Sequence, residues 1–135
     1  MKRSLVILFI FLCTVTFFSC KPNKTFTENE ITVVPQPGKM EIGSSSFKFK
    51  KNTQLVVENV DQEMVARHFA EMFKRAAGWD LPVVIGGTEG SNQVYFKTET
   101  VMGTEAYALE VSEKRIEVKA AKPAGFFYAT QTLRQ

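Results

Sequence analysis

The sequence predicts an α+β domain in which a β-sheet is covered by helices. Two observations support this class. In "YALEV" and "RIEVKA" apolar and polar residues alternate, which is typical of strands, whereas "VDQEMVARHFAEMFKRAAG" has apolar residues about every 3.6 positions, which is typical of a helix. The chain has 135 residues, of which 44% are hydrophobic and 12% aromatic. This length and composition suit one packed domain.

The first twenty residues are expected to lie outside this domain. Lys2 and Arg3 precede an apolar run from Leu5 to Phe18, and the run ends at Ser19 and Cys20. This order of parts is typical of a bacterial export signal. The run of 14 residues is also shorter than the roughly 20 residues that a membrane-spanning helix needs, so a permanent span is not favoured.

Cys20 follows a small residue at the end of the apolar run, as the lipidated cysteine of a bacterial lipoprotein does. We therefore interpret residues 1–19 as a lipoprotein signal peptide and Cys20 as the lipidation site, with an ordinary cleaved signal as the alternative. Residues 20–30 then form the lipidated cysteine and a polar tether, because "KPNKTFTENE" has no periodicity. We expect an exported protein anchored in the outer membrane and facing the periplasm, since no acidic run follows Cys20.

Composition argues against several classes of protein. Cys13 would leave with the signal and Cys20 would carry lipid, so the mature chain would have no thiol for a disulfide or a Cys-ligated metal site. Without residues 1–19, the 17 basic residues fall to 15 and face 14 acidic ones, which gives a net charge of +1. The basic residues are scattered among the acidic ones, so we expect no nucleic-acid partner.

The folded domain is expected to span residues 31–135 and to begin with short strands. β-Branched and alternating runs separated by Pro, Gly and Ser predict strands near Ile31–Val34, Lys39–Ile42, Phe47–Phe49 and Gln54–Glu58.

A helix is predicted next. Asp61 is the expected N-terminal cap, Val60 and Val65 are placed to close over it, and Gly78 is the expected left-handed stop. The stripe expected to face a sheet contains Val60, Met64, Val65, Phe69, Met72, Phe73 and Ala76. The polar residues expected to face away are Gln62, Glu63, Arg67, Glu71, Lys74 and Arg75.

The remaining elements are two further strands, a hairpin and a second helix. "LPVVIGG" and "QVYFKTE" are predicted strands, and residues 107–120 are a predicted hairpin that turns near Glu113 and Lys114. The segment from Pro123 is a predicted helix, since Pro is favoured in the first turn. It is apolar on more than one side, so it is the candidate to cover the apolar face of the sheet.

The residues provide little for catalysis. His68 is the only histidine and lies on the flank of the helical stripe, so we interpret it as structural or exposed. "IGGTEG" lacks the Lys of a phosphate-binding loop. The two aspartates, Asp61 and Asp80, have no acidic neighbour in the sequence. The glutamates around the hairpin, which are Glu105, Glu110, Glu113 and Glu117, are expected to be solvated.

Three segments nevertheless resemble a known family. These are "VVPQPGKMEIGSSSFKF", the helix after it, and "AYALEVSEKRIEVKAAKPAGFFYATQTLRQ". Together they resemble the N-terminal domain of bacterial β-N-acetylhexosaminidases of glycoside hydrolase family 20. The specific part is the last piece, with Ala124, Gly125, Phe127, Tyr128, Gln131, Thr132 and Leu133. The resemblance covers about Ile31 to Gln135.

The resemblance implies a mostly antiparallel β-sheet with two α-helices packed on one face, followed by a catalytic (β/α)-barrel. It also implies an enzyme that removes terminal N-acetylhexosamine from glycans, in which an adjacent Asp-Glu pair assists the substrate's own acetamido group. This chain has no Asp-Glu dipeptide, so no catalytic residue is carried over. We expect a noncatalytic domain, truncated before the barrel and inactive alone, that supports and positions the barrel and uses no cofactor or metal.

The expected partners are the barrel of the same parent chain and, through the lipid on Cys20, a membrane; a glycan would be bound only through the barrel. Two alternatives stay open. The same domain could serve another glycoside hydrolase, such as an O-GlcNAcase-like enzyme. A free-standing glycan-binding lipoprotein would need an exposed aromatic platform, for which Trp79, Tyr95 and Tyr107 are the candidates, although Trp79 is favoured as a core residue.

Overall fold

The structure is a computed structural model that describes residue 27 and residues 30–135. The segments interpreted as signal peptide, lipidated Cys20 and most of the tether lie outside the described residues. The described elements are β1 (Gln54–Val57), α2 (Val60–Ala77), β2 (Val83–Ile85), β3 (Gln93–Thr98), β4 (Tyr107–Val111), β5 (Arg115–Ala120) and α3 (Pro123–Leu133). No described helix is long and apolar enough to cross a bilayer.

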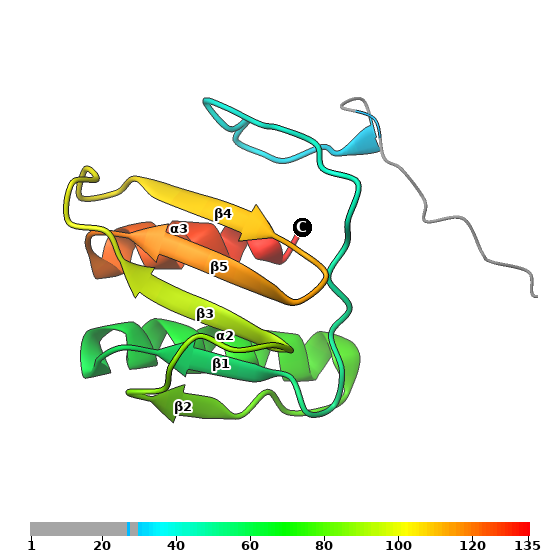
Figure 1. The fold of residues 1–135 in the computed structure, drawn as a ribbon, viewed down its shortest axis with the longest axis vertical. Coiled ribbons are helices and arrows are strands. Elements are labelled where there is room, and N and C mark those ends of the chain that lie inside the picture. Colours follow the sequence, from blue (N-terminus) through cyan, green and yellow to red (C-terminus); the bar gives the residue numbers. More distant parts are fainter. Residues whose placement is uncertain (1–26, 28–29) are drawn as a thin grey trace, which may run out of the picture.

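The five strands form one sheet in the order β2-β1-β3-β5-β4, and both helices cover the same face of it (Figure 1). α2 packs on β1 and β2, α3 packs on β4 and β5, and the two helices touch each other. Alternate strand residues point into this layer, where they meet the inward side chains of the helices. The central members of this core are Leu55, Val57, Val65, Phe69, Val94, Phe96, Ile116, Val118 and Phe126. The α+β class with two helices on one face is therefore confirmed.

The sheet is mixed, so the expectation of a mostly antiparallel sheet is wrong in that detail. β1 pairs in parallel with both β2 and β3, and β3 pairs in parallel with β5. Only the predicted hairpin of β4 and β5 is antiparallel. The chain order explains this arrangement. α2 carries the chain back along β1, so that β2 runs in the same direction as β1. β4 occupies the edge of the sheet and turns back into β5, which therefore lies beside β3 and runs parallel to it.

The segment of residues 31–49, here called the N-terminal arm, has no strand in the structure. The predicted strands Ile31–Val34, Lys39–Ile42 and Phe47–Phe49 are irregular, and only the prediction at Gln54–Glu58 is confirmed, as β1. The alternating residues of the arm find apolar partners rather than a neighbouring strand. The rings of Phe47 and Phe49 lie 5.1 Å apart, and Phe49 lies 4.9 Å from Phe73 of α2.

The first helix is confirmed, but it is capped and rotated differently from the prediction. Its cap is Asn59, whose side-chain oxygen accepts hydrogen bonds from the backbone N–H groups of Asp61 and Gln62 at 3.1 Å, so Asp61 is not the cap. Val60 is exposed and closes over nothing, whereas Gln62, expected to face away, is buried. The stop at Gly78 is left-handed, with φ of 80°, as predicted.

The predicted helix at Pro123 is confirmed as α3, and its glycine marks a close approach to the sheet. A Cβ atom at Gly125 would collide with the carbonyl oxygen of Ala106 and would lie 2.9 Å from the Cβ of Ala120. Only glycine therefore lets the first turn of α3 lie so close to the strands. Further along the helix, the ring of Phe126 lies 5.8 Å from that of Phe96, between α3 and β3.

Candidate docking surface

The chemically reactive side chains of the described residues do not gather into a catalytic site. His68 is exposed on α2, with the ring of Phe127 at 6.0 Å. Asp61 lies in the first turn of α2, whereas Asp80 lies beyond its other end and pairs with Lys74 at 2.9 Å. In the described part of the chain, no three His, Cys, Asp or Glu residues are grouped so that they could hold a metal ion.

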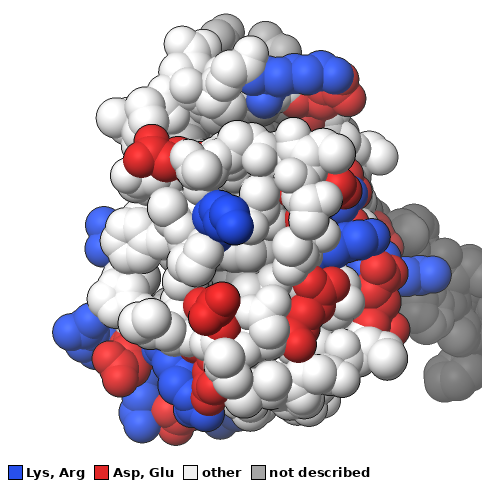
Figure 2. Space-filling model, turned by 90° about the vertical axis from the view of Figure 1, so that its left-hand side faces the viewer, with Lys and Arg blue, Asp and Glu red and all other residues white. Residues whose placement is uncertain are grey.

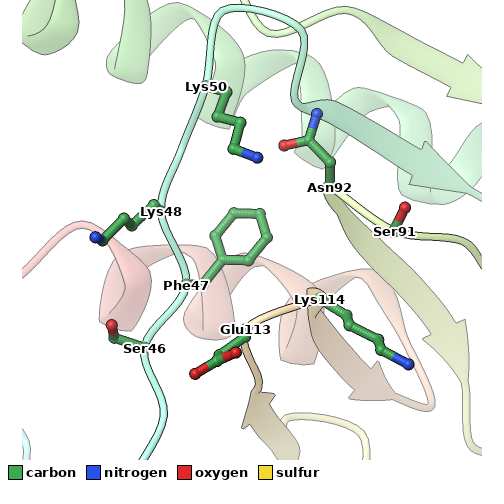
Figure 3. A pocket seen from close by; sticks show the side chains of 8 residues that line it. All are labelled: Ser46, Phe47, Lys48, Lys50, Ser91, Asn92, Glu113 and Lys114. Carbon is green, nitrogen blue, oxygen red and sulfur yellow. The ribbon is translucent and has the colours of Figure 1, made fainter. Parts of the chain in front are cut away.

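A shallow groove of about 470 Å³ lies between the N-terminal arm and the turn that joins β4 to β5. Its lining includes three lysines, but Figure 3 shows that Lys48 and Lys114 point away in opposite directions, with Phe47 between them. An anion site needs cationic groups that converge on one point. The full lining is Ser46, Phe47, Lys48, Lys50, Ser91, Asn92, Glu113 and Lys114. This groove therefore does not favour a binding function.

The face of the sheet opposite the helices carries paired charges, and we call it the charged face. Its members are Glu89, Lys97, Glu110, Arg115, Glu117 and Lys119. Arg115 binds Glu89 at 2.8 Å, and Lys119 binds Glu110 at 2.6 Å and Glu117 at 3.2 Å. Lys97 lies 3.6 Å from Glu89 and 3.8 Å from Glu117. Three acids face three bases, so the charges balance within the chain.

Glu117 does not follow the expectation that the hairpin glutamates are solvated. It is buried on β5, between Lys97 and Lys119. The pair of Glu110 and Lys119 shows how these ion pairs shift pKa values. The hydrogen bond from Lys119 lowers the pKa of Glu110, and the same bond raises the pKa of Lys119. Both groups are therefore held in their charged forms, which suits a face that stays in water.

A polar cluster, in which Gln62 and Tyr95 are buried and Glu58 is exposed, joins the end of β1 to the start of α2 and the end of β3. The Glu58 carboxylate accepts hydrogen bonds from the backbone N–H of Thr98 at 2.8 Å and from the hydroxyl of Tyr95 at 3.3 Å. The side chain of Gln62 donates to the hydroxyl of Thr98 at 2.9 Å and accepts from the backbone N–H of Glu58 at 2.7 Å. Every polar group of Gln62 thus has a partner, and the cluster ties three elements together.

The same cluster shifts two pKa values. Partial burial acts to raise the pKa of Glu58, but the hydrogen bonds from Thr98, Gln62 and Tyr95 together outweigh it, so the pKa lies below its ordinary value. Burial, followed by the nearby charge of Glu58, raises the pKa of Tyr95. A carboxylate that receives several hydrogen bonds is stabilised in its ionised form, and here those bonds come from α2 and β3 of the same chain.

The three aromatic residues considered for a glycan platform lie in different places. Trp79 is half-buried, with its ring 5.6 Å from that of Phe73, and it is not a member of the buried core. Tyr95 is buried beneath the charged face. Tyr107 is half-buried, and its hydroxyl shares a 2.7 Å hydrogen bond with Thr132 of α3. They do not form a shared platform, so the geometry gives the glycan-binding alternative no support.

The outward side of the two helices is the surface that lacks partners within the described residues. Eight large apolar side chains are exposed in the described part of the chain, and four of them lie on the two helices. Val60 and Met64 of α2 are 68% and 72% exposed, and Phe127 and Tyr128 of α3 are 40% and 43% exposed. We call these four residues the outer helix face. Met64 lies one turn before His68, whose ring contacts Phe127, so the four side chains form one neighbouring group across both helices.

Figure 2 views the end of the molecule at which β1, β3 and β5 finish and both helices begin. Most of this surface is white, which marks every residue other than Lys, Arg, Asp and Glu; charged side chains of both signs are densest at the right and lower left, and a few stand in the middle. The loop between β3 and β4 belongs to this end and presents Val101, which is 88% exposed. This end therefore carries few charges and at least one fully exposed apolar side chain, whereas the outer helix face carries four exposed apolar side chains.

The sequence predicts the helices that build this surface but not the surface itself. Val60, Met64 and Ala76 belong to the stripe expected to be buried, and the structure exposes all three. The signal that was present is the width of the stripe. Seven apolar residues on α2 extend around more of the helix than one sheet can cover. The one predicted site residue, Cys20, lies outside the described residues.

The chain matches a known family over most of its length. Residues 30–135 match the sequence model described as glycosyl hydrolase family 20, domain 2. No curated protein matches the chain.

Several solved structures share the fold. An exo-β-N-acetylglucosaminidase of family GH20 from Vibrio harveyi has a TM-score of 0.68 at 24% identity, covering 83% of this chain and 17% of that chain. The GH20 β-N-acetylhexosaminidase from Streptomyces coelicolor A3(2) has a TM-score of 0.67 at 26% identity, covering 76% and 20%. The β-N-acetylhexosaminidase from Bacteroides fragilis NCTC 9343 has a TM-score of 0.60 at 27% identity, also covering 76% and 20%. The chain thus spans 17–20% of the length of these proteins.

Proposed function

We propose that this chain, which belongs to the family described as glycosyl hydrolase family 20, domain 2, is the noncatalytic domain of a β-N-acetylhexosaminidase. The parent enzyme would remove terminal N-acetylhexosamine from glycans, and this domain would support and position a catalytic (β/α)-barrel of the same parent chain. The observation that carries the proposal is the match over residues 30–135. The solved relatives, which are much longer, are named as enzymes of this activity.

The outer helix face supports this role because it is the surface best suited to dock the barrel. Fully burying a large apolar side chain contributes roughly 1.5–3 kcal/mol, so covering these four partly exposed residues would contribute several kcal/mol in total. A barrel in the same chain is present at high effective concentration, which lowers the entropy cost of docking. The charged face is the poorer candidate, since covering it would remove water from six charged groups that already have partners.

The chemistry is assigned to the barrel because this chain lacks the groups for it. Hydrolysis of a glycoside needs an acid placed beside the leaving oxygen and a nucleophile, and the resemblance implies an adjacent Asp-Glu pair for this purpose. The sequence contains no Asp-Glu dipeptide. The carboxylates of Glu110 and Glu117 on the charged face are bound to Lys119.

A domain exchange tests the proposal. Residues 31–135 would replace the corresponding domain of the Bacteroides fragilis enzyme, and turnover of p-nitrophenyl N-acetylglucosaminide would be measured for the chimaera and for the 135-residue chain alone. We expect an active chimaera and no turnover by the chain alone. Turnover by the chain alone would overturn the proposal.

Matched variants of the chimaera test the docking surface. The double variant Met64→Lys, Phe127→Lys places two charges where the barrel is expected to pack, and should lower the temperature at which activity is lost. Val101→Lys adds a charge at an exposed apolar residue that lies outside the outer helix face, and should leave that temperature nearly unchanged. Equal behaviour of the two would contradict docking through the outer helix face.

The location of the protein is part of the same proposal. The order of Lys2, Arg3, the apolar run and Cys20 supports export and lipidation at Cys20, which would anchor the domain in the outer membrane facing the periplasm. Metabolic labelling with a palmitate analogue tests this step. The native chain should incorporate the label and fractionate with membranes, whereas Cys20→Ser should lose the label. Labelling that survives Cys20→Ser would contradict lipidation at that residue.

A further inference from the structure

One pair of hydrogen bonds joins the N-terminal arm to the end of α3. The side-chain oxygen of Gln135 accepts from the backbone N–H of Val34 at 2.9 Å, and its amide nitrogen donates to the backbone oxygen of Val34, also at 2.9 Å. The two residues are 101 positions apart. One carboxamide therefore satisfies both backbone groups of a single residue in a segment that has no sheet partner.

The chemistry of this contact is specific to an amide. A carboxamide presents an acceptor and a donor side by side, which matches the donor and acceptor of an extended residue. An ionised carboxylate could only accept, and an ammonium group could only donate. Gln135 therefore satisfies the backbone N–H and carbonyl oxygen of Val34, which a neighbouring strand would satisfy in a sheet.

The arm has few other connections to the rest of the domain. Among the described hydrogen bonds of residues 31–49, the two made by Gln135 are the only ones that reach another element. An apolar attachment lies at the far end of the arm, where Phe47 and Phe49 pack against the core and the rings of Phe49 and Phe73 lie 4.9 Å apart. The residues between these two points are rich in Pro, Gly and Ser and contribute no strand. The path of the arm near Val34 therefore depends on Gln135.

We propose that Gln135 is a positioning residue that clasps the arm at Val34 and so fixes the direction of the arm relative to α3. Its biological consequence rests on the proposed function: the arm would follow the tether from the lipid, and α3 would precede the barrel, so the clasp would set the direction of the barrel relative to the membrane. The clasp itself is a property of this chain, and it can be tested without any catalytic domain.

The variant Gln135→Glu makes the clasp switchable. A protonated carboxyl group can accept from the N–H of Val34 and donate to its carbonyl oxygen, whereas the ionised form can no longer donate. In ¹⁵N–¹H spectra of the full chain in detergent micelles, we expect the Val34 amide signal of this variant to match the native signal near pH 3. It should move away as the introduced carboxyl ionises around its ordinary pKa of about 4.3. The native chain at the same pH values supplies the reference.

Two further variants complete the test. Gln135→Ala should lose the native Val34 signal at every pH, and exchange of that amide with solvent should accelerate on the order of tenfold. Ala124→Glu introduces a carboxyl at an exposed position in the first turn of α3, at the opposite end of the helix from the clasp, and should leave the Val34 signal at its native position throughout. A Val34 signal that ignores both Gln135 variants, or that responds equally to Ala124→Glu, would overturn the proposal. Failure of the domain exchange would leave this titration unaffected, so the two proposals fail separately.

Discussion

The charged face and the outer helix face lie on opposite sides of the same small domain, and they differ in whether their side chains find partners. On the charged face, Glu89, Glu110 and Glu117 all have basic partners within the chain. On the outer helix face, Met64 and Phe127 are exposed to solvent. The sequence pattern alone does not distinguish the two faces, because both consist of ordinary strand and helix residues. The presence or absence of partner side chains in the structure distinguishes them.

The difference shows which surface has a reason to be covered. A balanced set of ion pairs gains little by leaving water, because burial removes the solvation of every charge. An apolar group gains with each square ångström that is covered. The comparison therefore predicts that the helix side responds to changes in apolar volume, and that the sheet side responds to charge, salt and pH. The following experiments test that division, beginning with the largest expected effect.

Neighbouring phenylalanines on α3 separate the inward from the outward side of the helix layer. Phe126 is 2% exposed and lies against Phe96, so Phe126→Ala should lower the free energy of unfolding by about 3–5 kcal/mol. Phe127 points outward, and Phe127→Ala should cost about 1 kcal/mol or less in the chain alone. Urea denaturation followed by circular dichroism measures both. Equal losses would mean that the outer helix face is already part of the core.

Replacing Gln62, whose amide is buried, tests the polar cluster that joins β1, α2 and β3. Gln62→Ala leaves the hydroxyl of Thr98 and the backbone N–H of Glu58 without their partners, so it should lower the free energy of unfolding by about 1–3 kcal/mol. The matched control is Glu71→Ala, an exposed position on the same helix, where the change should stay within about 0.5 kcal/mol. A loss at Gln62 as small as that at Glu71 would show that the cluster does not hold the elements together.

Gln62 and Met64 also show how far the sequence can predict this structure. The sequence predicted α2, its stop at Gly78, the hairpin and α3, because each depends on periodicity or on a local backbone requirement. It could not predict which way α2 faces, since apolar residues occur around much of the helix. Gln62 is buried, where it donates a hydrogen bond to the hydroxyl of Thr98 at the end of β3. Met64, two positions later in the helix, therefore faces outward.

The parallel pairing and the irregular arm were missed for a similar reason. Alternation predicts that a segment such as Phe47–Phe49 places its apolar residues on one side, but it does not say whether a strand or a cluster of rings receives them. Likewise, the order β2-β1-β3-β5-β4 depends on long-range pairing that no local signal encodes. The candidate surface was missed with them, because it is defined by what the other elements leave uncovered.

Glu58 provides a smaller effect that depends on pH. Its pKa in the folded chain is below its unfolded value, so the stabilisation is fully present above the unfolded pKa and is lost as the pH falls through the folded pKa. The native chain should therefore be more stable than Glu58→Gln near pH 7, and the gap should narrow toward pH 3. Urea midpoints at several pH values measure it. Glu105→Gln is the control, at an exposed loop position, and a gap of constant size would contradict the role of ionised Glu58.

The smallest effect is expected on the charged face, where a single change leaves other partners in place. Lys119→Met keeps much of the side-chain volume but removes a cation from between Glu110 and Glu117, while Lys97 stays 3.8 Å from Glu117. The loss should be about 1 kcal/mol or less, and about 0.5 M salt should reduce it further by screening the remaining charges. The matched change on the other side is Met64→Leu, whose effect should not depend on salt because no charge changes. If salt altered both variants equally, the division between a charge-governed face and an apolar face would be wrong, and the reason for expecting a partner on the helix side would be lost with it.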